Sequence, residues 1–96
     1  ALTAMALRVE FTPTGWEDYC HWVEADAQVV ERIHELIKDI GRDPFKGLGK
    51  PEPLRHDLAG FWSRRINGEH RLVYAITGDK KDRKVAVLMC RYHYDR

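Results

Sequence analysis

The spacing of the apolar residues changes along this chain, and the order of the changes limits the folds that it can adopt. Residues 7–11 alternate between apolar and polar side chains, which is typical of a half-buried strand. Two helical patterns follow, and strand-like segments then occupy residues 61–66, 69–76 and 85–91. Because strands and helices do not alternate as βαβ units, the sequence predicts an α+β fold, with an N-terminal strand and two helices packed on one face of a mainly antiparallel sheet.

The first helix is expected to begin with a capping box. In this motif the side chains of Thr14 and Glu17 satisfy free N–H groups of the first turn. Helical spacing predicts that its inner face consists of Trp16, Tyr19, Cys20 and Val23.

The second helix is expected over residues 27–42, with Asp26 as its N-terminal cap. It should end where Gly41 and Pro44 interrupt the apolar pattern. The following residues, 43–53, are rich in proline and glycine, so we expect an irregular loop that can carry a site.

The dipeptide Asn67-Gly68 predicts a hairpin between two of the strands. A two-residue loop would pair Arg64 with Arg71, whereas the loop Asn67-Gly68-Glu69 pairs Arg65 with Arg71. Only the longer loop keeps both apolar sets on one face, so we expect that register. Trp62, Ile66, Leu72, Tyr74 and Ile76 should then face the helices, leaving Ser63, Arg65, Arg71 and Val73 on the open face. Two directly opposed arginines repel each other unless an anion lies between them, which indicates a phosphate site.

The length and composition are those of one small domain. Ninety-six residues, 44% of them hydrophobic, provide one core, so residues 1–96 are expected to form a single domain. Residues 1–5 show no apolar pattern. We interpret them as a disordered segment, or as residues added before a natural start at Met5. The apolar stretches are shorter than the roughly 20 residues of a membrane helix, so we expect no membrane association and a cytoplasmic location. Cys20 and Cys90 lack a disulfide spacing and are interpreted as small buried apolar residues.

Charge is distributed unevenly, although the net charge is only +1. Residues 24–43 contain six acidic and three basic residues, a balance of −3, whereas residues 46–71 contain six basic and three acidic residues, a balance of +3. If the second segment forms one face, it is a local anion site on a nearly neutral protein; the alternative is a mixed, solvated surface.

Several familiar motifs are incomplete. In the glycine-rich stretch that ends at Lys50, the lysine is followed by Pro51 rather than by Ser or Thr, which argues against a nucleotide-binding loop. His34-Glu35 begins like a zinc-protease motif, but Lys38 stands where the second histidine is required. Ser63 has no partners for nucleophilic catalysis. We therefore expect no metal and no cofactor.

The remaining polar residues include the parts that RNA cleavage without a metal requires. A base must take the proton of the ribose 2′-OH, cations must stabilise the phosphorane, and an acid must protonate the leaving 5′-oxygen. The candidates are Glu52, Arg55, His56, Arg65, Arg71 and the segment from Arg91 to Tyr94. Taken alone, each of these residues can also be interpreted without a catalytic role, as a loop acid, a strand-end residue or a surface cation.

Several stretches of the sequence resemble a known family. They are Asp43-Pro44-Phe45, Gly49-Lys50-Pro51-Glu52-Pro53-Leu54, Gly60-Phe61-Trp62-Ser63-Arg64-Arg65-Ile66, Glu69-His70-Arg71-Leu72-Val73-Tyr74 and Arg91-Tyr92-His93-Tyr94. In these stretches the chain resembles the YoeB branch of the RelE-type toxins, which are ribosome-dependent mRNA endonucleases of bacterial toxin–antitoxin pairs. The resemblance extends from about Leu7 to Tyr94 and implies the RelE-like microbial RNase fold.

The resemblance implies roles for individual residues. Glu52 would be the general base and His93 the general acid, with Tyr94 positioning or protonating the leaving group. Arg65 and Arg71 would stabilise the transition state. RNA or ribosome contacts would come from Lys50, Arg55, His56, Arg64 and Arg91. Arg55 stands where the family usually has lysine, and Asp95 and Arg96 follow the tyrosine at which the family usually ends.

The expected function is therefore that of a type II toxin that cleaves mRNA on the 70S ribosome by 2′-OH attack and inhibits translation. The expected partners are a YefM-like antitoxin, the ribosome with its mRNA, and a second copy in a homodimer. One alternative is a toxin of the same fold that inhibits a protein such as gyrase, and another is a simple RNA-binding module. A pure binder does not need both an acid and a base, so Glu52 and His93 favour the nuclease.

Overall fold

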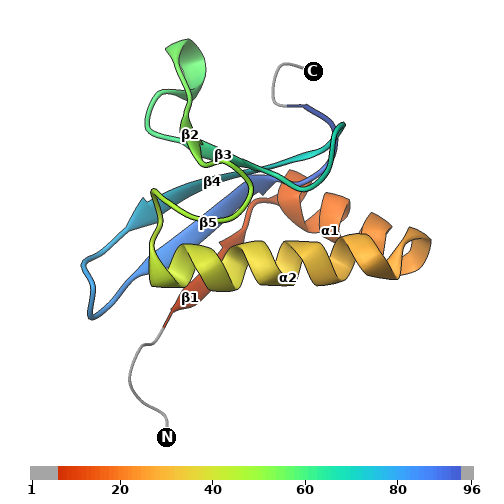
Figure 1. Ribbon diagram of the computed structural model, residues 1–96, viewed down its shortest axis with the longest axis horizontal. Coiled ribbons are helices and arrows are strands. Elements are labelled where there is room, and N and C mark those ends of the chain that lie inside the picture. Colours follow the sequence, from red (N-terminus) through yellow and green to blue (C-terminus); the bar gives the residue numbers. More distant parts are fainter. Residues whose placement is uncertain (1–6, 94–96) are drawn as a thin grey trace, which may run out of the picture.

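The computed structural model describes residues 7–93, which form two helices and one five-stranded sheet (Figure 1). In chain order the elements are β1 (Arg8–Phe11), α1 (Pro13–Ala25), α2 (Ala27–Arg42), β2 (Glu52–Pro53), the 3-10 helix η1 (His56–Leu58), β3 (Trp62–Arg65), β4 (Arg71–Thr77) and β5 (Lys84–Met89). The strand order is β1-β5-β4-β3-β2, and only the pairing of β1 with β5 is parallel. The predicted α+β class and the mainly antiparallel sheet are confirmed. The expectations for residues 1–5 and for Tyr94, Asp95 and Arg96 lie outside the described residues.

Helix α1 begins earlier than the sequence predicted. Its cap is Thr12, not Thr14, and Pro13 occupies the first helical position, which suits its fixed φ. The Thr12 hydroxyl accepts the Gly15 N–H at 3.0 Å and donates to the Leu88 carbonyl on β5 at 2.7 Å. This second bond ties the cap to the sheet, which explains why Thr12 is used. The cap of α2 is Asp26, as predicted, and its carboxylate accepts the N–H groups of Gln28 and Val29.

The inner face of α1 also differs from the prediction. Trp16 and Val23 are 53% and 56% exposed, whereas Trp22 and Asp18 are buried and Tyr19 and Cys20 are half-buried. The difference arises because α1 packs through polar contacts that periodicity does not reveal. Apolar spacing therefore located the helix but not its buried side.

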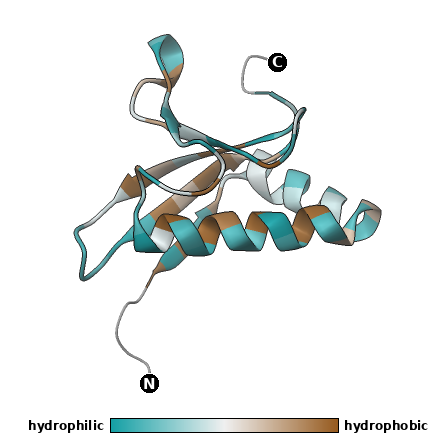
Figure 2. Cartoon of the chain, in the orientation of Figure 1, coloured by the Kyte–Doolittle hydropathy of each residue, from teal (hydrophilic) through white to brown (hydrophobic). Residues whose placement is uncertain are grey.

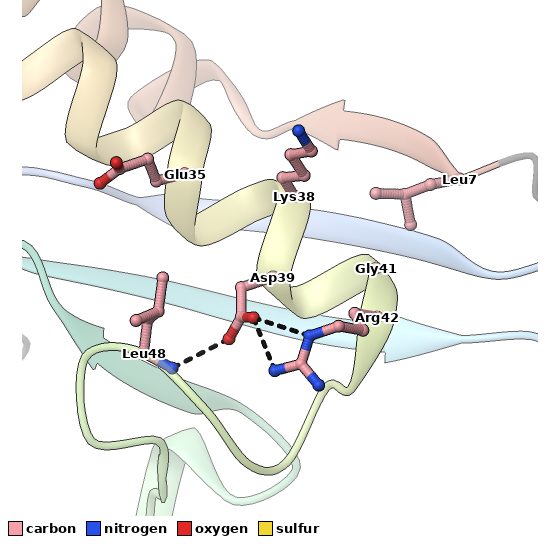
Figure 3. Close-up of a pocket in the computed structure, with 7 residues that line it drawn as sticks. All are labelled: Leu7, Glu35, Lys38, Asp39, Gly41, Arg42 and Leu48. Carbon is pink, nitrogen blue, oxygen red and sulfur yellow. Dashed lines mark hydrogen bonds and ion pairs between the residues drawn. The ribbon is translucent and has the colours of Figure 1, made fainter.

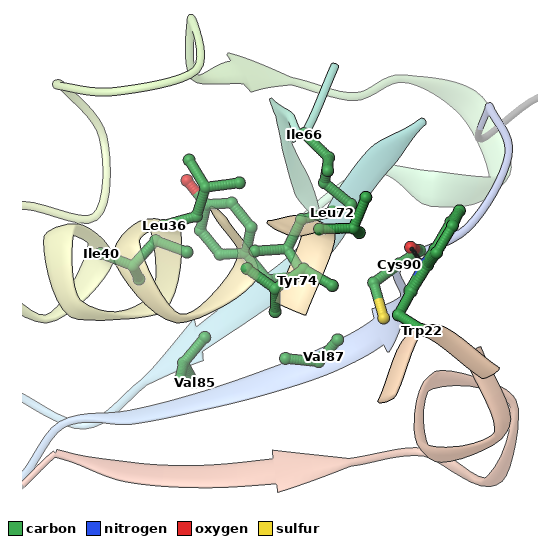
Figure 4. Packing of buried hydrophobic residues seen from close by; sticks show 11 residues of the cluster. Trp22, Leu36, Ile40, Ile66, Leu72, Tyr74, Val85, Val87 and Cys90 are labelled. Carbon is green, nitrogen blue, oxygen red and sulfur yellow. Dashed lines mark hydrogen bonds between the residues drawn. The ribbon is translucent and has the colours of Figure 1, made fainter. Parts of the chain in front are cut away.

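The main core lies between α2 and the central strands (Figures 2 and 4). It contains Trp22, Val29, Ile33, Leu36, Ile40, Ile66, Leu72, Tyr74, Val85, Val87 and Cys90. The predicted helix-facing residues of the hairpin are confirmed, with Trp62 and Ile76 packed at the margin of this cluster. Burying such side chains provides the main stabilisation of the fold, at about 25 cal/mol per Å² of apolar surface.

The opposite face of the sheet is partly covered. Val73 was expected on an open face, and it does point away from the helices, but it is fully buried together with Leu54 and Met89. Leu54 comes from the loop that follows β2, so this loop lies over the sheet. The open face is therefore limited to the end of the hairpin that carries Arg65 and Arg71. No helix within residues 7–93 is long and apolar enough to cross a membrane.

Candidate active site

The β3–β4 hairpin adopts the register that places Arg65 opposite Arg71. The prediction from the apolar pattern is confirmed, and the Asn-Gly alternative is wrong. The turn is built by the Asn67 side-chain oxygen, which accepts the N–H groups of Glu69 and His70 at 2.9 and 2.8 Å. The His70 carbonyl in turn accepts the Ile66 N–H at 3.0 Å, which closes a three-residue loop.

Glu52 lies on the same face of the sheet as the two arginines. Directly paired residues point to the same side, and one row runs across four strands through Glu52, Ser63, Val73 and Met89. Arg65 and Arg71 form the next row, two residues further along. The irregular loop predicted over residues 43–53 thus ends in a short strand, and this pairing positions the carboxylate of Glu52.

The backbone of Arg65 is held at both of its polar groups. Its N–H donates to the Gly49 carbonyl at 2.7 Å, and its carbonyl accepts from Arg32 Nη2 of α2 at 3.3 Å. Lys50, next to Gly49, has a φ of 53°, a left-handed conformation that non-glycine residues rarely adopt. The loop before Glu52 is therefore fixed to the strand that carries Arg65, while the Arg65 side chain is exposed.

The guanidinium of Arg71 binds the hairpin turn. Its Nη1 donates to the carbonyls of Asn67 and His70 at 2.8 and 3.1 Å. These acceptors supply partial negative charge, so the arginine pair is compatible with the fold when no anion is bound. The side chain nevertheless stays at the exposed end of the hairpin, next to Arg65.

The segment that follows β5 runs beside the start of β4. The Arg71 N–H donates to the Tyr92 carbonyl at 3.0 Å, and the Tyr92 N–H donates to His70 Nδ1 at 2.6 Å. His93 is the next residue and is half-buried. Arg91 places its guanidinium 4.6 Å from the centre of the Tyr92 ring, a cation–π contact. Tyr94, the fifth expected catalytic residue, lies outside the described residues.

Arg64 is not on the exposed surface of the hairpin. It is fully buried on the helix side of the sheet, where Nη1 lies 2.6 Å from Asp39 Oδ2 and Nε donates to the Tyr74 hydroxyl at 3.1 Å. Nη2 donates to the Asp43 and Lys46 carbonyls at 2.6 and 3.2 Å. Arg64 thus joins α2 to the loop of residues 43–48, and the expected RNA contact is corrected to a structural role.

Asp39 is the acidic partner in this network. Burial raises the pKa of its carboxyl, but hydrogen bonds from the Leu48 N–H and from the Arg42 and Arg64 guanidiniums outweigh that effect and lower the pKa to about 2. The pairing of Asp39 with Arg64 could not be predicted from the sequence, because the two residues are 25 positions apart, although Arg42 is a local partner of Asp39 on the same helix. Asp39 also lines a pocket, together with Leu7, Glu35, Lys38, Gly41, Arg42 and Leu48 (Figure 3). Within this pocket the Asp39 carboxylate accepts hydrogen bonds from Arg42 and from the Leu48 N–H. This pocket contains none of the expected catalytic residues.

The other expected binding residues lie around Glu52. Lys50, Arg55 and His56 are all exposed. A pocket beside β2 is lined by Glu52, Pro53, Leu54, Arg55, His56 and Leu58. His56 has a φ of 58°, a second left-handed residue close to Glu52. The structure thus places Glu52 and the arginine pair on one face of the sheet, with Arg55 and His56 beside Glu52 at its edge. Among residues 7–93, no three His, Cys, Asp or Glu side chains are grouped so as to hold a metal ion.

Comparison with solved structures shows the same fold in several toxins. A YoeB/ParE toxin from Agrobacterium tumefaciens superposes with a TM-score of 0.85 at 48% identity, covering 91% of this chain and 99% of that chain. A YoeB–YefM complex from Staphylococcus aureus superposes with a TM-score of 0.81 at 41% identity, covering 93% of this chain and 99% of that chain.

Sequence comparison gives the same result. Toxin YoeB of Streptomyces coelicolor is 57% identical over 88 residues, which are 92% of this chain and all of that protein. Toxin YoeB of Escherichia coli K12 is 52% identical over the same shares of both chains. The model of the YoeB-like toxins of bacterial type II toxin–antitoxin systems matches residues 11–94. The chain therefore belongs to the YoeB-like toxin family of bacterial type II toxin–antitoxin systems.

Proposed function

We propose that this toxin is a ribosome-dependent, metal-independent mRNA endoribonuclease. In this proposal Glu52 takes the proton of the ribose 2′-OH, Arg65 and Arg71 stabilise the phosphorane, and His93 protonates the leaving 5′-oxygen, assisted by Tyr94. The products are a 2′,3′-cyclic or 3′-phosphate and a 5′-hydroxyl.

The order of these residues across the sheet carries the proposal. Glu52 is on β2, Arg65 on β3, Arg71 on β4, and His93 follows a residue bonded to Arg71 on the far side. Displacement at phosphorus is in line, so the attacking and leaving oxygens lie on opposite sides of the phosphorus atom. A base on one side of an arginine pair and an acid on the other side match that requirement.

The arginine pair supports a phosphate between base and acid. Directly opposed residues have their Cβ atoms about 5 Å apart, so an anion between their guanidiniums can contact both. Fixed cations are most effective where charge increases during the reaction, as it does on the phosphorane oxygens. Lys50 and Arg55 are exposed close to Glu52 in the chain and would extend the positive surface along an RNA strand.

The expected partners follow from the relatives. The Staphylococcus aureus toxin has been solved as a YoeB–YefM complex and as a YoeB dimer. We therefore infer a YefM-like antitoxin and a homodimer for this chain. Action on 70S ribosomes in the cytoplasm is part of the proposal that rests on the resemblance to RelE-type toxins. Inhibition of a protein target remains the alternative function, but it does not require a carboxylate and a histidine on either side of an arginine pair.

The test uses ribosomes programmed with a short mRNA of defined sequence. Wild-type toxin should cut the mRNA in the decoding site and leave a 5′-hydroxyl. A single 2′-deoxy substitution on the nucleotide that supplies the nucleophile should abolish the cut, whereas the same substitution one nucleotide away should not. Cleavage that survives loss of the attacking 2′-OH would contradict the mechanism, and binding with no cleavage at all would favour a binding module.

A further inference from the structure

The segment that leads to His93 is held by hydrogen bonds to α1 and to residues at the start of β4. Both backbone groups of Cys90 are bonded to α1: its N–H donates to Asp18 Oδ2 at 3.0 Å, and its carbonyl accepts from Trp22 Nε1 at 2.9 Å. Figure 4 shows Cys90 beside Trp22. Both backbone groups of Tyr92 are bonded to the start of β4, through His70 and Arg71. Cys90 and Tyr92, two alternate residues that precede His93, are thus both fixed by hydrogen bonds.

Tyr92 needs this fixing because its backbone is strained. Its φ is 65°, in the left-handed region, which is unfavourable for a bulky residue. Such a conformation persists only where surrounding contacts determine it. The 2.6 Å bond from the Tyr92 N–H to His70 Nδ1 is a side-chain contact to this backbone.

His70 is itself held in place to accept that bond. It is 8% exposed, and its ring packs edge-on against Trp22 with a centroid distance of 4.8 Å. Because Nδ1 accepts an N–H, the neutral ring must carry its proton on Nε2. The Glu69 carboxylate lies 3.6 Å from Nε2, which favours a proton on that nitrogen. Trp22 therefore supports both anchors, His70 through its ring and Cys90 through its indole N–H.

From this geometry we infer that His70 is a positioning residue of the nuclease: its Nδ1 keeps Tyr92 left-handed and so sets the place of His93 beside Arg71. The inference rests on the proposed function only for its effect on cleavage. If His70 only filled space beside Trp22, phenylalanine would replace it without effect on Tyr92 or on catalysis.

The test compares three variants. His70→Phe keeps a ring against Trp22 but removes the acceptor. His70→Asn restores an acceptor, since its oxygen is attached to Cγ as Nδ1 is. The control is His21→Phe, because the His21 ring packs against the same indole at the same 4.8 Å from within α1. Folding of each variant is checked by urea unfolding.

Cleavage by these variants gives the functional result. In single-turnover assays on ribosomes, His70→Phe should cleave about tenfold to a hundredfold more slowly, because a displacement of about 1 Å can reduce a rate to that extent. His70→Asn should recover most of the rate, and His21→Phe should cleave at the wild-type rate. A substrate with a 5′-thiolate leaving group needs no proton donor, so it should largely restore cleavage by His70→Phe. Equal rates for His70→Phe and His21→Phe, or no recovery in His70→Asn, would overturn the inference.

A second measurement does not depend on nuclease activity. In the free protein, the Tyr92 amide should exchange with solvent more than tenfold faster in His70→Phe than in wild type or in His21→Phe. Unchanged exchange would overturn the inference even if cleavage falls. If the exchange changes as expected but wild-type protein cuts no mRNA, the anchor stands and the proposed function fails.

Discussion

Nη1 of Arg64 lies 2.6 Å from Asp39 Oδ2 inside the protein, although the neighbouring Arg65 is exposed on the other face of the sheet. Two adjacent arginines thus have opposite roles: one holds the loop that leads to Glu52, and the other faces the proposed RNA site.

Arg64→Met should lower the free energy of unfolding by about 3 kcal/mol, because the Asp43 and Lys46 carbonyls lose the buried guanidinium that donates to them. Urea unfolding measures the effect. Arg65→Met is the matched control and should change stability by no more than about 0.5 kcal/mol, as expected for an exposed residue. Similar losses in both variants would contradict the assignment of Arg64 as the structural arginine.

The Asp39 pair also predicts a dependence of stability on pH. The pKa of this carboxyl is about 2 in the folded protein against an ordinary value of 3.8, so the folded state favours the ionised form. The corresponding stability is fully present above about pH 5 and is lost as the pH falls toward 2. Urea unfolding between pH 6 and pH 2.5 should therefore show a smaller decline for Asp39→Asn than for wild type. Parallel declines would show that Asp39 does not contribute.

Arg65→Ala should slow cleavage about a hundredfold with the fold intact, since removing one preorganised charge from a transition state costs about 3 kcal/mol. The measurement is the single-turnover rate on saturated ribosomes. Arg8→Ala removes the same charge from β1, at the opposite edge of the sheet, and should leave the rate unchanged. If only the affinity of Arg65→Ala for ribosomes falls, Arg65 binds RNA without acting in the chemical step.

The division of labour between Glu52 and His93 can be tested by the leaving group. Glu52→Gln and His93→Gln should each reduce the cleavage rate, because one lacks the base and the other the acid. A 5′-thiolate leaving group should restore cleavage by His93→Gln alone. Equal restoration of both variants, or restoration of Glu52→Gln alone, would mean that the acid and the base are assigned the wrong way round.

Cleavage should persist when transition metals are removed. The proposed mechanism assigns every proton transfer and all charge stabilisation to side chains, so a chelator selective for zinc and related ions should leave the rate unchanged. Ribosome integrity is monitored in parallel by sedimentation. Loss of activity that one added metal restores would contradict the mechanism.

The pairing of Arg65 with Arg71 could be predicted from the sequence because a slip of one residue exposes a whole apolar face. The same alternation places Arg64 on the helix side with Trp62 and Ile66, so its burial could also be predicted. Its pairing with Asp39 could not be predicted, since Asp39 lies 25 residues earlier on a helix and other acceptors of Arg64 are backbone carbonyls.

Other features depended on contacts between distant residues. The choice of Thr12 over Thr14 is tied to a bond with Leu88, although Pro13 at the first helical position was a local signal. The anchoring of Tyr92 by His70 joins residues 22 positions apart through a backbone N–H, which no pattern of side chains reveals. Periodicity reports which face of an element is apolar, but not which polar groups meet across the fold.

The position of β5 determines when during synthesis the sheet can be completed. Among the strands of residues 7–93 it is made last, yet it lies between β1 and β4 and is the only one of them that pairs with β1. A nascent chain that lacks residues 84–93 has neither a complete sheet nor the acid side of the proposed site. The sheet therefore cannot close until residues 84–89 have emerged from the ribosome, so a shorter nascent chain leaves the paired edges of β1 and β4 without their partner.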